Sequence, residues 1–146
     1  MWAWKQPALD RGGWDTHIAQ GTTGGYLANQ LDDVAKSLAA FAADLGPELS
    51  RVSCLVMTEF GRRVAENSGL GTDHGRASCW LTLGGAGGGK VHSRWKPLKP
   101  ENLEAPGDVP VTIDYRDILA DVLTRRLNLD GKTLFPGAPG SWHSPA

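Results

Sequence analysis

Two short segments of the chain each place an aspartate next to, or near, a histidine. They are Asp15-Thr16-His17 and Asp73-His74-Gly75. In an extended segment, residues two apart point to the same side, so Asp15 and His17 can face one ion. The glycines at positions 71 and 75 permit the bend that would turn both Asp73 and His74 inward. We therefore predict that the two pairs meet around a shared cation pocket.

Imidazole nitrogen and carboxylate oxygen together suit a divalent zinc, manganese or iron ion, and the two pairs can hold one or two such ions. Glu59 follows an apolar run, and it is the fifth predicted metal ligand. An ion with an open position can polarise an ester oxygen or acidify a bound water. Arg62 is the predicted catalytic cation that stabilises anionic oxygens; a surface charge or a pair with Glu59 are the alternatives. Asn67 and Thr72 are the predicted substrate-binding residues.

Hydrophobic periodicity indicates the elements that position these residues. Apolar residues at three- and four-residue steps predict amphipathic helices over residues 25–45 and 114–127, the second with Asp114 as its N-cap. Uncharged apolar runs predict buried strands at 52–58 and 78–83. A polar loop of about fifteen residues is expected between these strands, a glycine-rich irregular segment at 84–89, and an extended proline-rich connection at 96–111.

This order of elements predicts an α/β fold. Sites in open α/β sheets form beyond the carboxyl ends of the strands, where Glu59 and the Asp73-His74 loop are expected. The length of 146 residues corresponds to one domain with irregular ends at 1–9 and 138–146, and it is sufficient for a hydrophobic core.

Composition excludes several classes of function. A formal net charge of −1 argues against nucleic-acid or membrane-surface partners, and no apolar run is long enough to span a membrane. Cys54 and Cys79 are expected to be small buried thiols rather than a disulfide. The first residues lack the order of a signal peptide, so a cytoplasmic location is expected.

Several motifs in the same order resemble the family catalogued as domain of unknown function 1501, which looks like a branch of the alkaline phosphatase and sulfatase superfamily. The resemblance covers roughly residues 10–137. The motifs are Gly12-Gly13-Trp14-Asp15-Thr16-His17, Thr58-Glu59-Phe60-Gly61-Arg62, Asn67, Gly71-Thr72-Asp73-His74-Gly75 and Val111-Thr112-Ile113-Asp114-Tyr115-Arg116.

The resemblance implies a partial sulfatase-like sheet flanked by helices, with long glycine- and proline-rich loops and divalent metals at the strand ends. By position, Asp15, His17 and His74 resemble the ligand set of one metal site. In one alignment Glu59 and Phe60 lie where relatives have an Asp-His pair on a second metal, and Asp73 becomes an accessory ligand. In the other alignment, Asp73-His74 takes the place of that pair.

The chain resembles only the C-terminal part of that superfamily, in which the nucleophile lies upstream, so no nucleophile is predicted here. Full-length relatives are often exported. The leading hypothesis is a metal-dependent phosphate- or sulfate-ester hydrolase domain without its nucleophile half. The alternative is a non-catalytic binding or assembly module with a vestigial or structural metal site. Since a sheet cut from a larger one leaves an exposed edge, a homodimer or a partner that completes the sheet is predicted.

Overall fold

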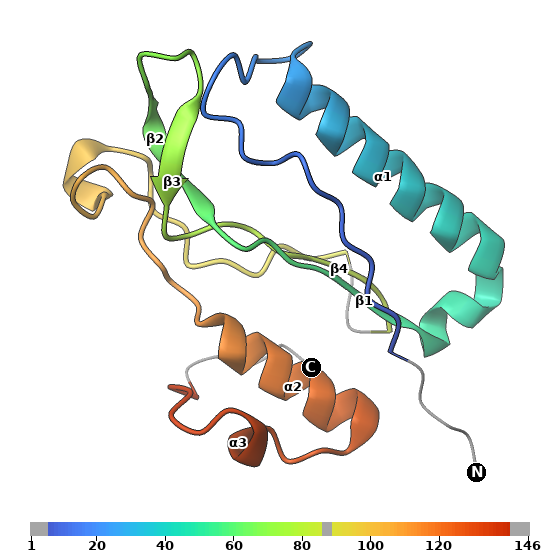
Figure 1. Ribbon diagram of the computed structural model, residues 1–146. Helices are drawn as coiled ribbons and strands as arrows, with labels where there is room; N and C mark the ends of the chain where they lie inside the picture. Colours follow the sequence, from blue (N-terminus) through green and yellow to red (C-terminus); the bar gives the residue numbers. More distant parts are fainter. Residues whose placement is uncertain (1–5, 86–88, 141–146) are drawn as a thin grey trace.

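The computed structural model describes residues 6–85 and 89–140, and it has a mixed α/β fold (Figure 1). The predicted α/β class is therefore confirmed. The elements, in chain order, are α1 (Tyr26–Leu45), η1 (Gly46–Arg51), β1 (Ser53–Val56), β2 (Gly61–Glu66), β3 (Thr72–Gly75), β4 (Leu81–Gly84), η2 (Pro100–Asn102), α2 (Tyr115–Leu127) and α3 (Gly131–Leu134). The four strands form two separate antiparallel pairs, β1–β4 and β2–β3.

Both predicted long helices are confirmed. Helix α1 ends at Leu45 because Gly46 adopts a φ of 49° and Pro47 follows it. The side chain of Asp114 accepts a hydrogen bond from the amide of Arg116, which makes it the N-cap of α2. The start of α1 is fixed to the preceding segment, since the buried Gln30 donates to the carbonyl of Gly12 and accepts from Arg11.

The expected polar loop between the two apolar strands is instead the β2–β3 hairpin. Arg62 lies opposite His74 in the ladder, and the register shifts between Arg62 and Glu66. Alternating polarity is weak here, because the strands consist largely of glycine and charged residues; the hydrophobic pattern therefore gave no strand signal. The prediction that Asp73 and His74 lie in a loop was wrong, since both belong to β3.

The two apolar strands exist but are shorter than predicted. β1 covers Ser53–Val56, and β4 begins at Leu81, three residues later than expected. The two pair antiparallel, so no parallel carboxyl-end edge gathers the site. The predicted connection over 96–111 is only partly extended, because it contains the 3-10 helix η2 and a turn at 104–108 closed by a bridge between Glu104 and Asp108. A second bridge, between Arg63 and Asp108, places this turn beside β2. Part of the glycine-rich 84–89 stretch lies outside the described residues.

The expected hydrophobic core is absent from the described part of the chain. None of the described hydrophobic side chains is buried; the buried polar residues are Thr16, Gln30, Asp108 and Asp117. Large apolar side chains remain exposed on several elements, among them Leu31 and Phe41 of α1 and Leu81 of β4. The prediction that β1 is covered on both faces was accordingly wrong, because all four of its residues are only half-buried.

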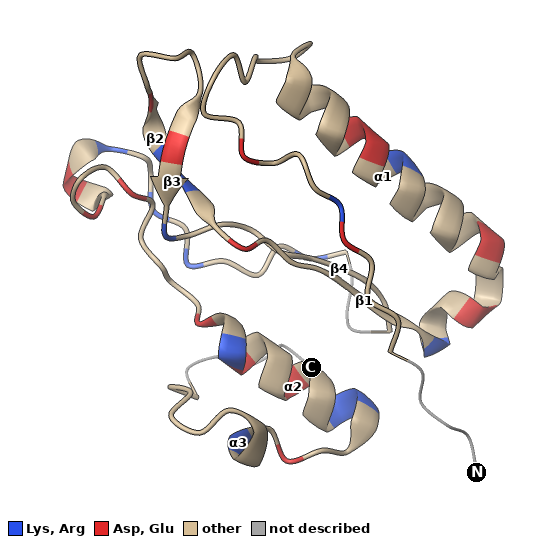
Figure 2. Cartoon of the chain, viewed as in Figure 1, with Lys and Arg blue, Asp and Glu red and all other residues tan. Residues whose placement is uncertain are grey.

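Cys54 and Cys79 are both free, but the prediction that both are buried was wrong, because Cys54 is half-buried and Cys79 is exposed. Within the described residues, no helix combines the length and apolar character needed to cross a bilayer. Acidic and basic residues are interspersed along the chain (Figure 2), with no long run of either sign.

Candidate metal centre

Asp15, His17 and His74 form one cluster, as predicted. Each offers a ligand atom, and the three atoms lie within 4.8 Å of one another. Oδ1 of Asp15 is 2.7 Å from Nε2 of His74 and 3.0 Å from Nε2 of His17. The two imidazole rings are 4.7 Å apart between centroids. Residues 59 positions apart in sequence thus converge, and the structure has a possible Asp/His/His metal-binding group. That both acid and imidazole pairs share one cation pocket stays a prediction.

The cluster forms because the irregular segment of residues 12–20 lies, at its end, directly on the turn of the β2–β3 hairpin (Figure 1). The amide of Ala19 donates to the carbonyl of Gly69, and the amide of Gln20 donates to that of Leu70. Only glycine permits this approach at position 71, where a Cβ would lie 2.4 Å from the carbonyl oxygen of His17. Backbone pairing therefore brings His17 to the hairpin that carries His74.

The predicted catalytic residue Arg62 lies at the edge of the cluster. Its guanidinium donates to the carbonyl oxygens of Trp14 and Thr72, and Nη2 is 4.0 Å from Oδ1 of Asp15. These bonds join the segment before His17 to strand β3. Phe60 stacks on the imidazole of His74, with centroids 4.1 Å apart, and the Arg62 guanidinium lies over the same phenyl ring.

Asp73 lies at the Nδ1 side of the His17 ring, whereas the cluster with Asp15 and His74 is at the Nε2 side. Its Oδ1 is 3.3 Å from Nδ1 of His17 and accepts a hydrogen bond of 3.0 Å from Nδ2 of Asn67. Its other oxygen is 3.6 Å from Arg63. Asn67, predicted to bind substrate, thus contacts Asp73 and the backbone of the turn.

Thr72, the other predicted substrate-binding residue, belongs to a second small network. Its hydroxyl donates to Oε1 of Gln20, which also accepts from the buried hydroxyl of Thr16. Gln20 was missed by the sequence analysis, because a glutamine in an irregular segment carries no motif. The signal that could have found it is its place three residues after His17 in the chain.

Glu59, the fifth predicted ligand, is an exposed residue between β1 and β2. Among the described residues, the group of clustered potential ligands comprises Asp15, His17 and His74 and does not include Glu59.

Hydrogen bonds to the two carboxylates favour their charged forms. The bond from His74 is the main cause that lowers the pKa of Asp15 below its ordinary value of 3.8, with contributions from the charges of His17 and Arg62. The bond from Asn67 is the main cause that lowers the pKa of Asp73, and the bond from His17 adds to it. Both carboxylates are therefore anionic at neutral pH, as a cation site requires.

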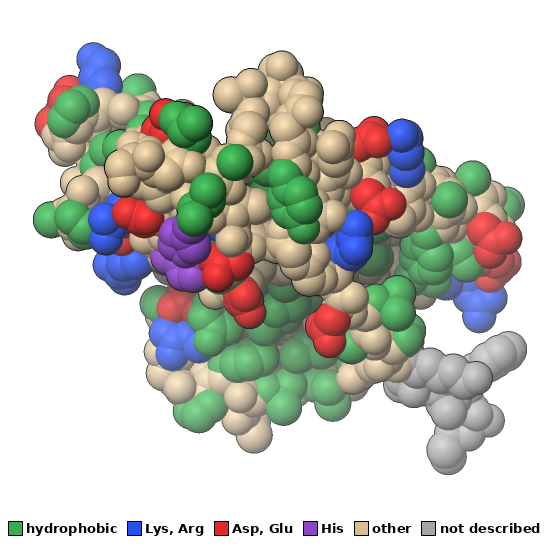
Figure 3. All heavy atoms as spheres, turned by 45° about the horizontal axis from the view of Figure 1, so that its top comes forward, with side chains coloured by type: hydrophobic (Ala, Val, Ile, Leu, Met, Phe, Trp, Pro, Cys, Tyr) green, Lys and Arg blue, Asp and Glu red, His purple; other side chains and the backbone are tan. Residues whose placement is uncertain are grey.

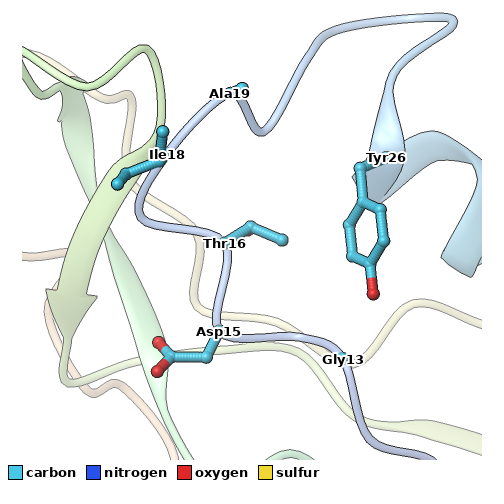
Figure 4. Close-up of a pocket in the computed structure, with 6 residues that line it drawn as sticks. All are labelled: Gly13, Asp15, Thr16, Ile18, Ala19 and Tyr26. Atoms are coloured by element: carbon cyan, nitrogen blue, oxygen red, sulfur yellow. The ribbon is translucent and has the colours of Figure 1, made fainter.

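A shallow pocket of about 440 Å³ adjoins Asp15 (Figure 4). Its wall includes Gly13, Ile18 and Ala19 of the irregular segment and Tyr26 from the first turn of α1. Figure 4 shows the side chain of Thr16 directed toward Tyr26 and the hydroxyl end of Tyr26 directed toward Gly13, while the Asp15 carboxylate points away from Tyr26 toward the hairpin. In the space-filling view, the histidines lie at the surface with acidic and basic side chains around them (Figure 3).

The donors fit a divalent ion. One carboxylate oxygen and two imidazole nitrogens form a three-ligand set of the kind that catalytic zinc sites use, with further positions left for water or substrate. The side chains are about half exposed, so an ion can reach them from solvent. The described chain is therefore a mixed α/β protein with a possible Asp/His/His metal-binding group.

The comparisons with known proteins place the chain in a family. The model of the family described as "Protein of unknown function (DUF1501)" matches residues 8–137, which is most of the chain. The chain therefore belongs to this family, as its motifs suggested. No curated protein and no solved structure matches the chain.

Proposed function

We propose that this chain binds a divalent zinc, manganese or iron ion through Asp15, His17 and His74, and that the site serves hydrolysis of phosphate or sulfate esters in a sulfatase-like domain of the alkaline phosphatase superfamily. One observation carries the proposal: three metal-binding side chains from two distant segments converge within 4.8 Å. The resemblance of the motifs supports the ester class.

Each residue has a role that its contacts support. When bound, the ion supplies a Lewis acid that polarises an ester oxygen or lowers the pKa of a bound water. Asp15 contributes the negative charge that holds the ion, and the imidazoles of His17 and His74 complete the ligand set. Arg62 places a cation 4.0 Å from Asp15, beside the position where negative charge develops on ester oxygens. Asn67 and Thr72 border the same region from the hairpin.

Metal content tests the first half of the proposal. We expect the purified protein to hold close to one equivalent of zinc, manganese or iron, and His17→Ala and His74→Ala variants to lose it. His92→Ala is the matched control, because it removes an imidazole from the exposed 89–99 segment. Less than about 0.2 equivalent in the unsubstituted protein after incubation with each metal would falsify the metal site.

Turnover tests the second half. Aryl phosphate and aryl sulfate esters are supplied to the metal-loaded protein, and the rate is compared with those of His17→Ala, His74→Ala and His92→Ala. We expect the first two substitutions to abolish turnover and the third to leave it unchanged. Equal rates in all four proteins would mean that the activity comes from elsewhere. Metal binding without turnover would leave the alternative function, a binding module with a vestigial or structural ion.

A second candidate function, assembly with another copy of the chain, is favoured by the exposed apolar surface. The accessible surface is 10637 Å², whereas a folded monomer of this mass exposes about 7,200 Å². Interfaces of obligate dimers bury about 2,000–5,000 Å² in total, so the excess is large enough for one. Among the described strands, β1 pairs only with β4, which leaves an edge for pairing.

We propose a homodimer, and its mass in solution tests this. A net charge of −1 places little repulsion between two copies. Light scattering after size exclusion is expected to give twice 15.6 kDa. Leu31→Asp on α1 is expected to weaken the dimer at least about tenfold, whereas Val91→Asp, at a position that is already 93% exposed, leaves it intact. A monomer at micromolar concentration rejects this assignment, whatever the metal content.

A further inference from the structure

All the hydrogen-bonding groups of the Asn67 side chain are occupied. Its Oδ1 accepts from the backbone amides of Gly69 and Gly71, at 2.9 and 3.1 Å. Its Nδ2 donates to the carbonyl oxygen of His17 at 3.1 Å and to Oδ1 of Asp73 at 3.0 Å. A carboxamide has two acceptor sites and two donor hydrogens, so each has one partner. The side chain is half-buried in the turn that joins β2 to β3.

These partners fix which way the amide points. The two backbone N–H groups can only donate, so the atom that faces them must be the oxygen. The carbonyl of His17 and the anionic Asp73 can only accept, so the atom that faces them must be the nitrogen. In the reverse orientation, the amide nitrogen would face two N–H donors and the amide oxygen would face two acceptors. Asn67 therefore presents a donor to Asp73 in a single orientation.

Asp73 connects this donor with the candidate metal site, because it contacts both Asn67 and His17. Oδ1 of Asp73 accepts from Asn67 and lies 3.3 Å from Nδ1 of His17. The two nitrogens of His17 thus face two anionic oxygens, that of Asp73 at Nδ1 and that of Asp15 at Nε2, 3.0 Å away in the cluster, and a neutral ring has one hydrogen to donate. A carboxylate held firmly beside Nδ1 favours the tautomer with the hydrogen on Nδ1, which leaves the lone pair of Nε2 for an ion.

We infer that Asn67 is a positioning residue for the metal site: it holds the Asp73 carboxylate beside Nδ1 of His17, which orients the ring and favours the tautomer whose Nε2 can bind an ion. This inference rests on the proposed function and assigns Asn67 a role other than substrate binding. Partners of this kind, one bond removed from the ligand, alter metal affinity by about 10–100-fold. The bonds from the turn amides to Oδ1 fix the position of the Asn67 side chain, and the bond from Nδ2 to Asp73 is the one that acts on the metal site.

Asn67→Asp separates these two parts of the side chain. The substituted residue keeps an oxygen for the amides of Gly69 and Gly71, but it replaces the donor with an acceptor that repels Asp73. Asn102→Asp is the matched control, since Nδ2 of Asn102 also donates to a carbonyl, that of Pro97, in an exposed segment. We expect Asn67→Asp to weaken Zn²⁺ binding about 10–100-fold in chelator competition, and Asn102→Asp to leave it within about twofold.

The tautomer of His17 in the metal-free protein is the second measurement. Long-range nitrogen–proton NMR spectra are expected to show a smaller share of Nδ1–H in Asn67→Asp than in the unsubstituted protein and in Asn102→Asp. A merely structural role in the turn would not change this ratio. Because the measurement needs no metal, it tests the inference even if the protein binds no ion, so a failure of the metal site is distinguishable from a failure of this role.

A double-mutant cycle with Asp73→Ala tests whether Asn67 acts through Asp73. Asp73→Ala is expected to weaken Zn²⁺ binding as much as Asn67→Asp, and the double variant is expected to bind no more weakly than Asp73→Ala alone. Additive losses would overturn the inference, as would an unchanged His17 tautomer in Asp73→Ala. If Asn67→Asp does not fold, Asp73→Ala alone decides through the tautomer of His17.

Discussion

The irregular segment 12–20 with the β2–β3 hairpin, called here the site region, is held together differently from the helical region of α2, α3 and the residues that follow to 140. In the site region, side chains bond to backbone groups about 50 residues away, as Arg62 does to Trp14 and Asn67 to His17. In the helical region, the contacts that form the helices are local: Asp114 and Asp130 cap their helices, and Gly131 packs against Ala120 of α2. The side-chain contacts of this region with the rest of the chain include the bond from Arg126 to the carbonyl of Ser50 and the ring contact of Tyr115 with Trp80.

The difference shows how a defined site exists without a hydrophobic core around it. Hydrogen bonds between a half-buried amide, a guanidinium and backbone carbonyls have fixed directions, so a small number of them determines where the ligands lie. Apolar packing in the helical region has no such directionality, and much of its surface is exposed; Figure 3 shows hydrophobic side chains gathered in the lower part of the view. We therefore expect metal affinity to depend on the site region alone.

Gly71→Ala is expected to have the largest effect, since the new Cβ would meet the carbonyl oxygen of His17 at 2.4 Å and that of Thr16 at 2.6 Å. Backbone atoms cannot move aside cheaply, so we expect the free energy of unfolding to fall by about 3 kcal/mol and metal affinity to be lost. Urea unfolding and chelator competition measure both quantities. Gly12→Ala, where a Cβ meets nothing within 4 Å, is the matched control, and equal effects of the two variants would contradict the close approach.

The sequence predicted which acidic and imidazole side chains cluster better than it predicted the structure that holds them. Asp15, His17 and His74 could be named because acid and imidazole pairs are rare in this chain and have motif spacing. The hairpin could not, because β2 and β3 have little hydrophobic alternation. Their pairing depends on glycines at 61 and 75 that lie opposite each other, a long-range relation that no local pattern contains.

The helices were predictable for the opposite reason. Both amphipathic periodicity and the Asp114 cap are local signals within one turn or a few. The role of Glu59 as a ligand rested on its place after an apolar strand of a presumed larger sheet, and the antiparallel β1–β4 pair does not provide that edge. Burial was overestimated because hydrophobic composition gives only the capacity to form a core and does not say what covers each face.

Addition of metal is expected to have the next largest effect on stability. An ion that binds only the folded state at 100 times its dissociation constant raises the free energy of unfolding by about 2.7 kcal/mol. We expect this increase in the unsubstituted protein and in Asp114→Ala, but not in His74→Ala, and we expect a chelator to reverse it. Urea unfolding with and without Zn²⁺ measures it. If Asp114→Ala lost the increase, metal affinity would not be confined to the site region.

Asp114→Ala is expected to lower the free energy of unfolding by about 1 kcal/mol, because it leaves the amide of Arg116 without its cap. Asp114→Asn keeps an acceptor oxygen and is expected to recover most of the loss, and neither substitution is expected to change Zn²⁺ affinity. Urea unfolding of the metal-free variants gives the first value, and chelator competition gives the second. If the alanine variant weakened metal binding, metal affinity would depend on the helical region as well, which would contradict the comparison.

Acid is expected to have the smallest effect in the site region. The pKa values of Asp15 and Asp73 are lowered in the folded state from an ordinary 3.8 by hydrogen bonds from His74 and Asn67. A lowered carboxyl pKa contributes stability that is present above the unfolded value and is lost as the pH falls through the folded one. The loss therefore begins near pH 3.8 and grows below it, but solvent screens these exposed groups strongly.

The pKa of Asp114 is lowered too, mainly by its bond from Arg116, and its side chain is only 22% exposed. Metal-free Asp15→Asn/Asp73→Asn should thus keep most of the acid dependence of unfolding as the pH falls through 3.8 and below, whereas Asp114→Asn should flatten it more. If the double variant flattened the acid dependence more than Asp114→Asn in urea titrations, the stronger electrostatic contribution would lie in the site region.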